Sequence, residues 1–157
     1  MDEVRILIAD ESSVYKKMFI KVAEEMSEHN RVTHVACGNE ALDKIRRQDY
    51  DIIVIDAEIP GLNVMSLLGE IAREIPKALI LVTARPSRAD ESLSVEVLAR
   101  GANICMTKPI YSSYNENVDA LKREIGGLAK ILHKRRSEEN KKQRTEPSAT
   151  KKRIKRK

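Results

Sequence analysis

The sequence contains few cysteines and no long hydrophobic run. Its two cysteines, Cys37 and Cys105, have neither the spacing of a metal site nor a CxxC motif, so we expect both to be reduced core residues. No apolar segment approaches membrane-spanning length, and the first apolar run begins too soon after Met1 for a signal peptide. These features predict a cytoplasmic protein without a transmembrane segment.

Histidine is also scarce, and the sequence has no internal repeat. His29, His34 and His133 cluster with no other metal-binding residue, so surface or strand-edge positions are the simplest interpretation. An apolar fraction of 41% is enough to form a core, and 34% of charged residues is typical of a soluble surface. We therefore expect a single α/β domain with a tail.

The net charge of +5 is unevenly distributed along the 157 residues. Residues 133–157 contain 12 Lys and Arg against 3 Asp and Glu, a net charge of +9, which leaves 17 and 21, or −4, for residues 1–132. We expect one folded domain over residues 1–134 and a basic, flexible tail over residues 135–157. The tail is interpreted as a solvated extension, a nonspecific binding site for polyanions, or part of a linker.

Apolar runs alternate with helical patterns along the first 134 residues. Strands are predicted over 4–9, 32–36, 52–55, 78–82 and 103–107. The predicted helices begin at Ser12 or Ser13, at Gly38, at Val64, at Ser87 or Asp90, and at Tyr114, the last ending near Lys134. This alternation predicts a doubly wound parallel α/β sheet with helices on both faces.

The most informative stretch is the β-branched run of residues 52–55, which leads into Asp56 and the pair Pro60-Gly61. A continuous run of this kind is typical of a strand buried on both faces. The Pro-Gly turn then places Asp56 at the carboxyl end of the strand, where ligands bind in open α/β sheets. We interpret Asp56 as a phosphate acceptor.

Polar residues follow three other predicted strands: Asp10-Glu11, Thr83 and Lys108. In a parallel sheet they meet Asp56 at one edge. Clustered carboxylates favour a hard divalent cation, and Mg²⁺ suits them because it binds carboxylate and phosphate oxygens. In this hypothesis Asp56 attacks phosphorus, Mg²⁺ and Lys108 neutralise the charge, and Thr83 hydrogen-bonds a phosphoryl oxygen.

This pattern, with Thr83-Ala84 and Lys108-Pro109, resembles the receiver domain of two-component response regulators. The resemblance implies a flavodoxin-like (βα)5 fold with strand order 2-1-3-4-5 and phosphorylation of Asp56 by a sensor histidine kinase. It implies that Glu11, Asp56 and the backbone carbonyl of Glu58 bind Mg²⁺, with Asp10 acting mainly through water. We expect a downstream protein to bind the face formed by the fourth helix, fifth strand and fifth helix.

Two stretches resemble more closely the receiver of the chemotaxis methylesterase CheB: residues 56–63, and residues 85–101 followed by Ala102 and Lys108-Pro109. Nothing after Lys134 resembles that enzyme's hydrolase, so no enzymatic activity is expected beyond self-catalysed phosphoryl transfer to Asp56 and hydrolysis from it. The sequence departs from the family in three places. Glu11 stands where a second Asp is usual, Asn63-Val64 replaces Asp-Gly, and Cys105 occupies the position of an aromatic residue that normally moves on phosphorylation.

Two alternatives and one local prediction follow. An atypical receiver that binds partners constitutively is favoured by Glu11 and Cys105, whereas an aspartyl-phosphate phosphohydrolase would need a second Asp at position 58. Glu58 and Arg85 lie two residues after Asp56 and Thr83, so we predict that they form an ion pair at the rim of the pocket. This pair would slow hydrolysis of the acyl phosphate, unless both charges are simply solvated.

Overall fold

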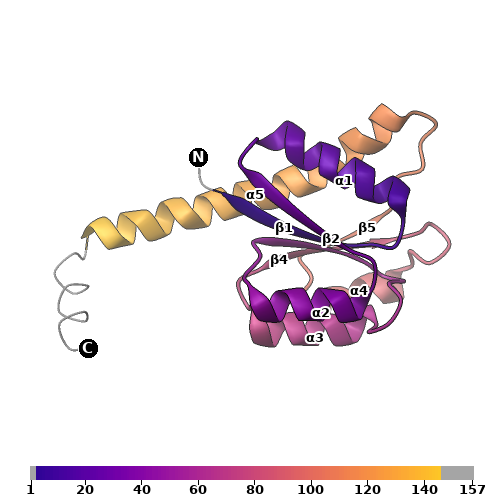
Figure 1. The fold of residues 1–157 in the computed structure, drawn as a ribbon, viewed down its shortest axis with the longest axis horizontal. Coiled ribbons are helices and arrows are strands. Elements are labelled where there is room, and N and C mark those ends of the chain that lie inside the picture. Colours follow the sequence, from indigo (N-terminus) through magenta and orange to yellow (C-terminus); the bar gives the residue numbers. More distant parts are fainter. Residues whose placement is uncertain (1–2, 146–157) are drawn as a thin grey trace.

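The computed structural model describes residues 3–145, which form a five-stranded parallel sheet with helices on both faces (Figure 1). The strand order is β2-β1-β3-β4-β5, as expected for a flavodoxin-like fold. The strands are β1 (Val4–Ala9), β2 (Asn30–Val35), β3 (Ile52–Asp56), β4 (Leu79–Ala84) and β5 (Ile104–Thr107). The predicted fold class is therefore confirmed.

The helices divide between the two faces of the sheet. Helices α1 (Ser13–Met26) and α5 (Tyr114–Thr145) cover one face, and α2 (Gly38–Arg47), α3 (Val64–Glu74) and α4 (Glu91–Ala99) cover the other (Figure 1). Each face has its own apolar cluster. Because β3 and β4 are buried along their whole length, their carboxyl ends are firmly held between these two layers.

Side-chain caps fix where three of the helices begin. Ser12, Asn63 and Asp90 accept hydrogen bonds from backbone N–H groups in the first turns of α1, α3 and α4, as their residue types favour. The turn after β3 depends on Gly61, whose φ of 78° favours glycine. Gly38 approaches this turn so closely that an added Cβ would lie 1.9 Å from the Leu62 carbonyl oxygen. These features determine the course of the loop that follows Asp56.

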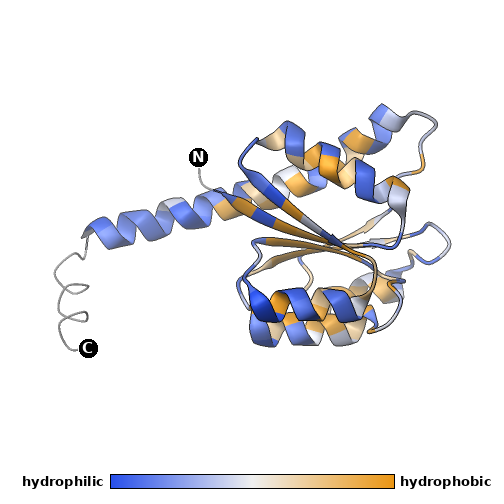
Figure 2. Ribbon diagram, in the orientation of Figure 1, coloured by the Kyte–Doolittle hydropathy of each residue, from blue (hydrophilic) through white to orange (hydrophobic). Residues whose placement is uncertain are grey.

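Helix α5 is longer than predicted, since it continues past Lys134 to Thr145. Two side chains attach it to the amino-terminal edge of the sheet. Arg136 Nη2 lies 3.1 Å from Asp51 Oδ1 and its Nη1 donates to the Glu3 carbonyl at 3.2 Å, while Arg135 Nη1 donates to the Lys77 carbonyl at 3.2 Å. Residues 135–145 are therefore helical and not a flexible tail, and this end of α5 is hydrophilic (Figure 2). The rest of the predicted tail, 146–157, lies outside the described residues.

The cysteines and histidines lie at the margin of the core or at the surface. Cys37 and Cys105 are free thiols, but both are half-buried at the margin of the core. His29 and His133 are exposed, and His34 lies on the edge strand β2, where its Nε2 is 2.7 Å from the Asp10 carbonyl oxygen. Within residues 3–145, no helix has the length and apolar character needed to span a membrane.

Candidate functional site

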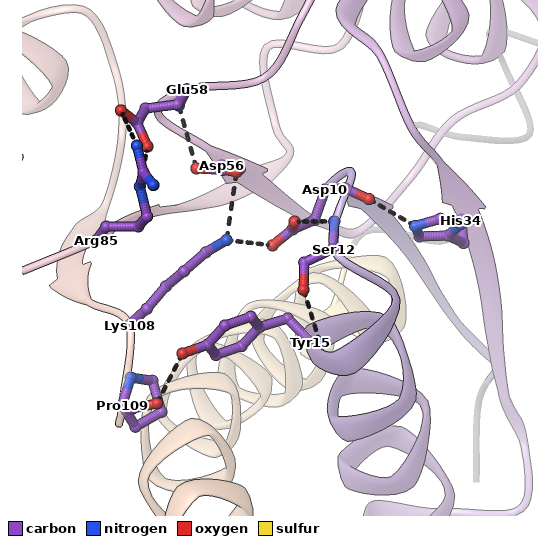
Figure 3. Close-up of polar contacts among 9 residues, drawn as sticks. All are labelled: Asp10, Ser12, Tyr15, His34, Asp56, Glu58, Arg85, Lys108 and Pro109. Atoms are coloured by element: carbon purple, nitrogen blue, oxygen red, sulfur yellow. Dashed lines mark hydrogen bonds and ion pairs between the residues drawn. The ribbon is translucent and has the colours of Figure 1, made fainter. Parts of the chain in front are cut away.

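Three charged side chains meet at the carboxyl edge of the sheet (Figure 3). The Nζ of Lys108, which follows β5, lies 2.8 Å from Asp10 Oδ2 after β1 and 3.2 Å from Asp56 Oδ2 at the end of β3. These residues are 4%, 0% and 8% exposed, respectively. The parallel topology brings together side chains that are far apart in the sequence, and one ammonium bridges two buried carboxylates.

Backbone amides hold the second oxygen of each carboxylate. Ser12 N–H donates to Asp10 Oδ1 at 2.8 Å, and Glu58 N–H donates to Asp56 Oδ1 at 3.1 Å. Both bonds come from the residue two positions later, so each short loop orients the carboxylate that precedes it. Asp56 therefore keeps Oδ2 directed at Lys108, where a phosphoryl group would be close to a cation.

Thr83 lies directly beside Asp56 in the sheet. The two residues are paired in the β3–β4 register, and Ala57 N–H donates to the Thr83 carbonyl at 2.7 Å. The Thr83 side chain is buried, and its Oγ1 has no hydrogen-bond partner among the described residues. A buried hydroxyl without a partner is costly, which is consistent with a group that bonds a ligand in another state.

A cavity of about 540 Å³ opens over these side chains. It is lined by charged and polar residues: Asp10, Glu11, Ser12, Tyr15, Asp56, Glu58, Arg85 and Lys108. The cavity therefore includes the predicted acceptor and all the predicted metal-binding residues, whereas Thr83 is fully buried and is not part of the lining.

The oxygen donors of this cavity suit a hard cation such as Mg²⁺. Asp10 and Asp56 are buried on either side of Lys108, and among residues 3–145 Asp10 Oδ2 has no hydrogen-bond partner, only the ion pair with Lys108. The Glu11 side chain is exposed, and within residues 3–145 no three acidic, His or Cys side chains form a compact cluster. The donor set offers two buried carboxylates to a cation, and the exposed carboxylate of Glu11 lines the same cavity.

The predicted ion pair at the rim is present. Arg85 binds Glu58 through two hydrogen bonds, Nε to Oε2 at 2.5 Å and Nη2 to Oε1 at 2.9 Å, and Arg88 Nε lies 3.1 Å from Glu58 Oε1 (Figure 3). The hydrogen bonds from Arg85 are the main cause that lowers the pKa of Glu58 below its ordinary value of 4.5. Glu58 is thus a carboxylate shared by two arginines of the β4–α4 loop, the second of which was not anticipated.

Tyr15 is a site residue that the sequence interpretation missed. Its ring lies 4.5 Å from Lys108 Nζ, and its hydroxyl donates to the Pro109 carbonyl at 2.8 Å. Burial is the main cause that raises its pKa above 10.0. The neighbouring Val14 is 55% exposed, so Tyr15 and not Val14 lies on the buried side of this first turn. The available signal was the spacing of Tyr15 to Phe19 and Val22, both buried.

Cys105 is half-buried and packs against the apolar cluster on the α4 side of the sheet. Burial is the main cause that raises the pKa of its thiol, and Ser94 of α4 opposes this effect. Cys105 is not among the residues that line the cavity. A rotation of a large ring at this position is impossible in this protein.

Sequence comparison finds relatives named protein-glutamate methylesterase/protein-glutamine glutaminase. The chain is 28% identical over 131 residues to a protein-glutamate methylesterase/protein-glutamine glutaminase of Rhodospirillum centenum, covering 83% of this chain and 33% of that protein. It is 31% identical over 107 residues to a second such enzyme, from Rhodopseudomonas palustris, covering 68% of this chain and 28% of that protein. The chain thus spans about a third of the length of these curated relatives.

Structural comparison gives the same fold. The response regulator domain of Thermotoga maritima CheB superposes with a TM-score of 0.68 at 21% identity, covering 81% of this chain and 96% of that one. The receiver domain of the Francisella response regulator 1452 gives 0.67 at 25% identity, with 82% and 98% covered. The family model for the response regulator receiver domain matches residues 6–122, which include the whole site. The chain belongs to the response regulator receiver domain family.

Proposed function

We propose that this protein is a two-component response regulator that is phosphorylated on Asp56 by a sensor histidine kinase. The observation that supports this most strongly is the buried Asp10–Lys108–Asp56 group under a polar cavity. Asp56 Oδ2 attacks the phosphorus of the phosphohistidine, and the P–N bond to the imidazole breaks. This chain takes part in that reaction and in hydrolysis of its own acyl phosphate, and we assign it no other enzymatic activity.

Each neighbouring residue has a separate role in this transfer. Lys108 neutralises negative charge on the phosphoryl oxygens, and the Thr83 hydroxyl donates a hydrogen bond to one of them. Asp10, Glu11, Asp56 and the Glu58 backbone carbonyl are the residues that would hold Mg²⁺, whose charge offsets that of the phosphate oxygens. The aspartyl-phosphate phosphohydrolase alternative is less well supported, because Glu58 is committed to two arginines and is not a free acid two residues after Asp56.

The signal leaves the domain, in this proposal, through the face formed by α4, β5 and α5. Exposed apolar side chains lie on α4 and on the segment between β5 and α5: Val95, Leu98, Ile110 and Tyr111. Exposed groups of this kind mark surfaces that bind proteins. We propose that phosphorylation of Asp56 changes the affinity of this face for a protein partner. In the alternative, the face binds its partner constitutively, with the same affinity whether or not Asp56 is phosphorylated.

The experiment is incubation of the protein with acetyl phosphate and Mg²⁺, followed by mass spectrometry of the intact chain and of its peptides. One added phosphoryl group on Asp56, absent in Asp56→Asn, is the expected result. Asp51→Asn is the matched control, because Asp51 lies at the opposite edge of the sheet. Failure to label the wild-type protein would favour the constitutive interaction module.

The basic end of the chain suggests a second, independent contact. Residues 133–157 carry a net charge of +9, which favours nonspecific binding to polyanions such as nucleic acid. Part of this stretch is the hydrophilic end of α5, and residues 146–157 lie outside the described residues. A steep salt dependence of DNA binding, lost on deletion of residues 145–157, would support this contact, and binding independent of salt would contradict it.

A further inference from the structure

Tyr15 contacts two neighbouring parts of the site at once. Its ring lies against the ammonium of Lys108, at 4.5 Å from the ring centre, and its hydroxyl donates at 2.8 Å to the carbonyl of Pro109, the next residue in the chain (Figure 3). One side chain from the first turn of α1 therefore holds both the head of Lys108 and the backbone beside it.

The geometry around Lys108 explains why such a support is needed. A lysine side chain has four rotatable bonds, and its ammonium has no fixed direction of hydrogen bonding. The two carboxylates attract the ammonium of Lys108, and the negative face of the Tyr15 ring attracts it as well. Because Lys108 is only 4% exposed, water competes weakly with these contacts.

Tyr15 is itself well anchored. Its backbone N–H donates to the Ser12 side chain at 3.4 Å, and Ser12 N–H holds the Asp10 carboxylate at 2.8 Å. The hydrogen bond to Pro109 then fixes the direction of the ring. The start of α1 and the end of β5 are thereby connected through a single aromatic side chain.

We infer that Tyr15 is the positioning residue for Lys108: it keeps the ammonium beside Asp56, where the incoming phosphoryl group needs it. This inference rests on the proposed phosphorylation of Asp56, although the contact itself can be tested without it. When Asp56 receives the phosphoryl group, the ammonium of Lys108 must move from the carboxylates toward the phosphoryl oxygens. The ammonium keeps its contact with the Tyr15 ring during this movement. Removing the ring leaves the ammonium with a wider range of positions and slows phosphoryl transfer.

The test compares Tyr15→Leu with Tyr15→Phe in the full chain. Tyr15→Leu removes the ring, and a desolvated cation–π contact of this kind corresponds to a decrease of about tenfold in the rate of Asp56 labelling by acetyl phosphate. Tyr15→Phe keeps the ring and loses only the hydroxyl, so its labelling rate should stay within about twofold to threefold of wild type. Tyr114→Leu is the matched control, because the Tyr114 ring contacts the ammonium of Lys21 at 5.3 Å on an exposed part of the protein.

A second measurement separates this inference from the proposed function. NMR of the Lys108 side chain should show the upfield ring-current shift of protons above an aromatic ring in wild type and Tyr15→Phe, and its loss in Tyr15→Leu. Equal labelling rates for Tyr15→Leu and wild type, or equally slow rates for the Leu and Phe variants, would overturn the inference. If the wild-type protein is not labelled at all, the proposed function fails, and the ring-current shift alone then decides whether Tyr15 positions Lys108.

Discussion

Replacing Lys108 with methionine should destabilise the protein far more than replacing an exposed lysine. Lys108 Nζ lies 2.8 and 3.2 Å from two carboxylate oxygens, which at an effective dielectric constant of about 20 gives attractions of about 6 and 5 kcal/mol before desolvation is subtracted. Removing one partner of a buried ion pair usually costs about 3–5 kcal/mol. Asp56 and Asp10 keep their backbone hydrogen bonds, so we expect a loss of about 3 kcal/mol.

The assay is urea unfolding at pH 7.5, followed by circular dichroism. The control is Lys122→Met, because Lys122 pairs with Glu25 at 3.5 Å while both side chains are nearly half exposed, and such pairs contribute about 0–1 kcal/mol. Adding Asp10→Asn to Lys108→Met should recover much of the loss, since it removes one of the two unpaired charges. If Lys108→Met were no less stable than Lys122→Met, the interpretation of the buried charge cluster would be wrong.

Two further predictions concern the rim of the site and the end of α5. Arg85→Ala should shorten the lifetime of phosphorylated Asp56 by roughly twofold to fivefold, as expected for loss of an exposed ion pair, and Arg100→Ala, which breaks the exposed pair with Glu96, should leave it unchanged. Because the pKa of Glu58 is lowered below 4.5, its pairing stabilises the fold fully above pH 4.5, and the stability difference between wild type and Arg85→Ala should decrease as the pH falls from 4.5 through the lowered pKa. Arg136→Ala should cost about 1–2 kcal/mol in urea unfolding, whereas Arg144→Ala, in the exposed end of α5, should cost less than about 0.5 kcal/mol; equal effects would refute the attachment through Asp51.

The elements that could be predicted are those set by local apolar patterns. The β-branched runs before Asp56 and Thr83 are buried on both faces, so their sequence alone identifies them as strands of a parallel sheet. The convergence of Asp10, Asp56 and Lys108 followed from that topology, because parallel strands end at one edge. The Glu58–Arg85 pair was predictable for the same reason, as each residue follows its strand end by two positions.

The parts that were missed depend on contacts between distant polar groups. Helix α5 continues past Lys134 although its apolar periodicity stops, because Arg135 and Arg136 bind backbone carbonyls and Asp51 at the far edge of the sheet. Tyr15 was missed because the helical pattern does not decide whether Val14 or the adjacent Tyr15 faces the core. Its orientation depends on the carbonyl of Pro109, which is 94 residues away in the sequence.

The charges around the cavity indicate how the site accommodates a phosphoryl group. The side chains that line it carry four negative charges, from Asp10, Glu11, Asp56 and Glu58, against the two positive charges of Lys108 and Arg85. A phosphoryl dianion adds further negative charge, so a divalent cation or a freed arginine has to compensate for it. Glu58 is paired with Arg88 as well as Arg85, so it would keep a partner if Arg85 turned toward a phosphoryl group. In the proposed phosphorylation of Asp56, this exchange of partners in the β4–α4 loop would connect the site to α4, because Cys105 has no ring to rotate.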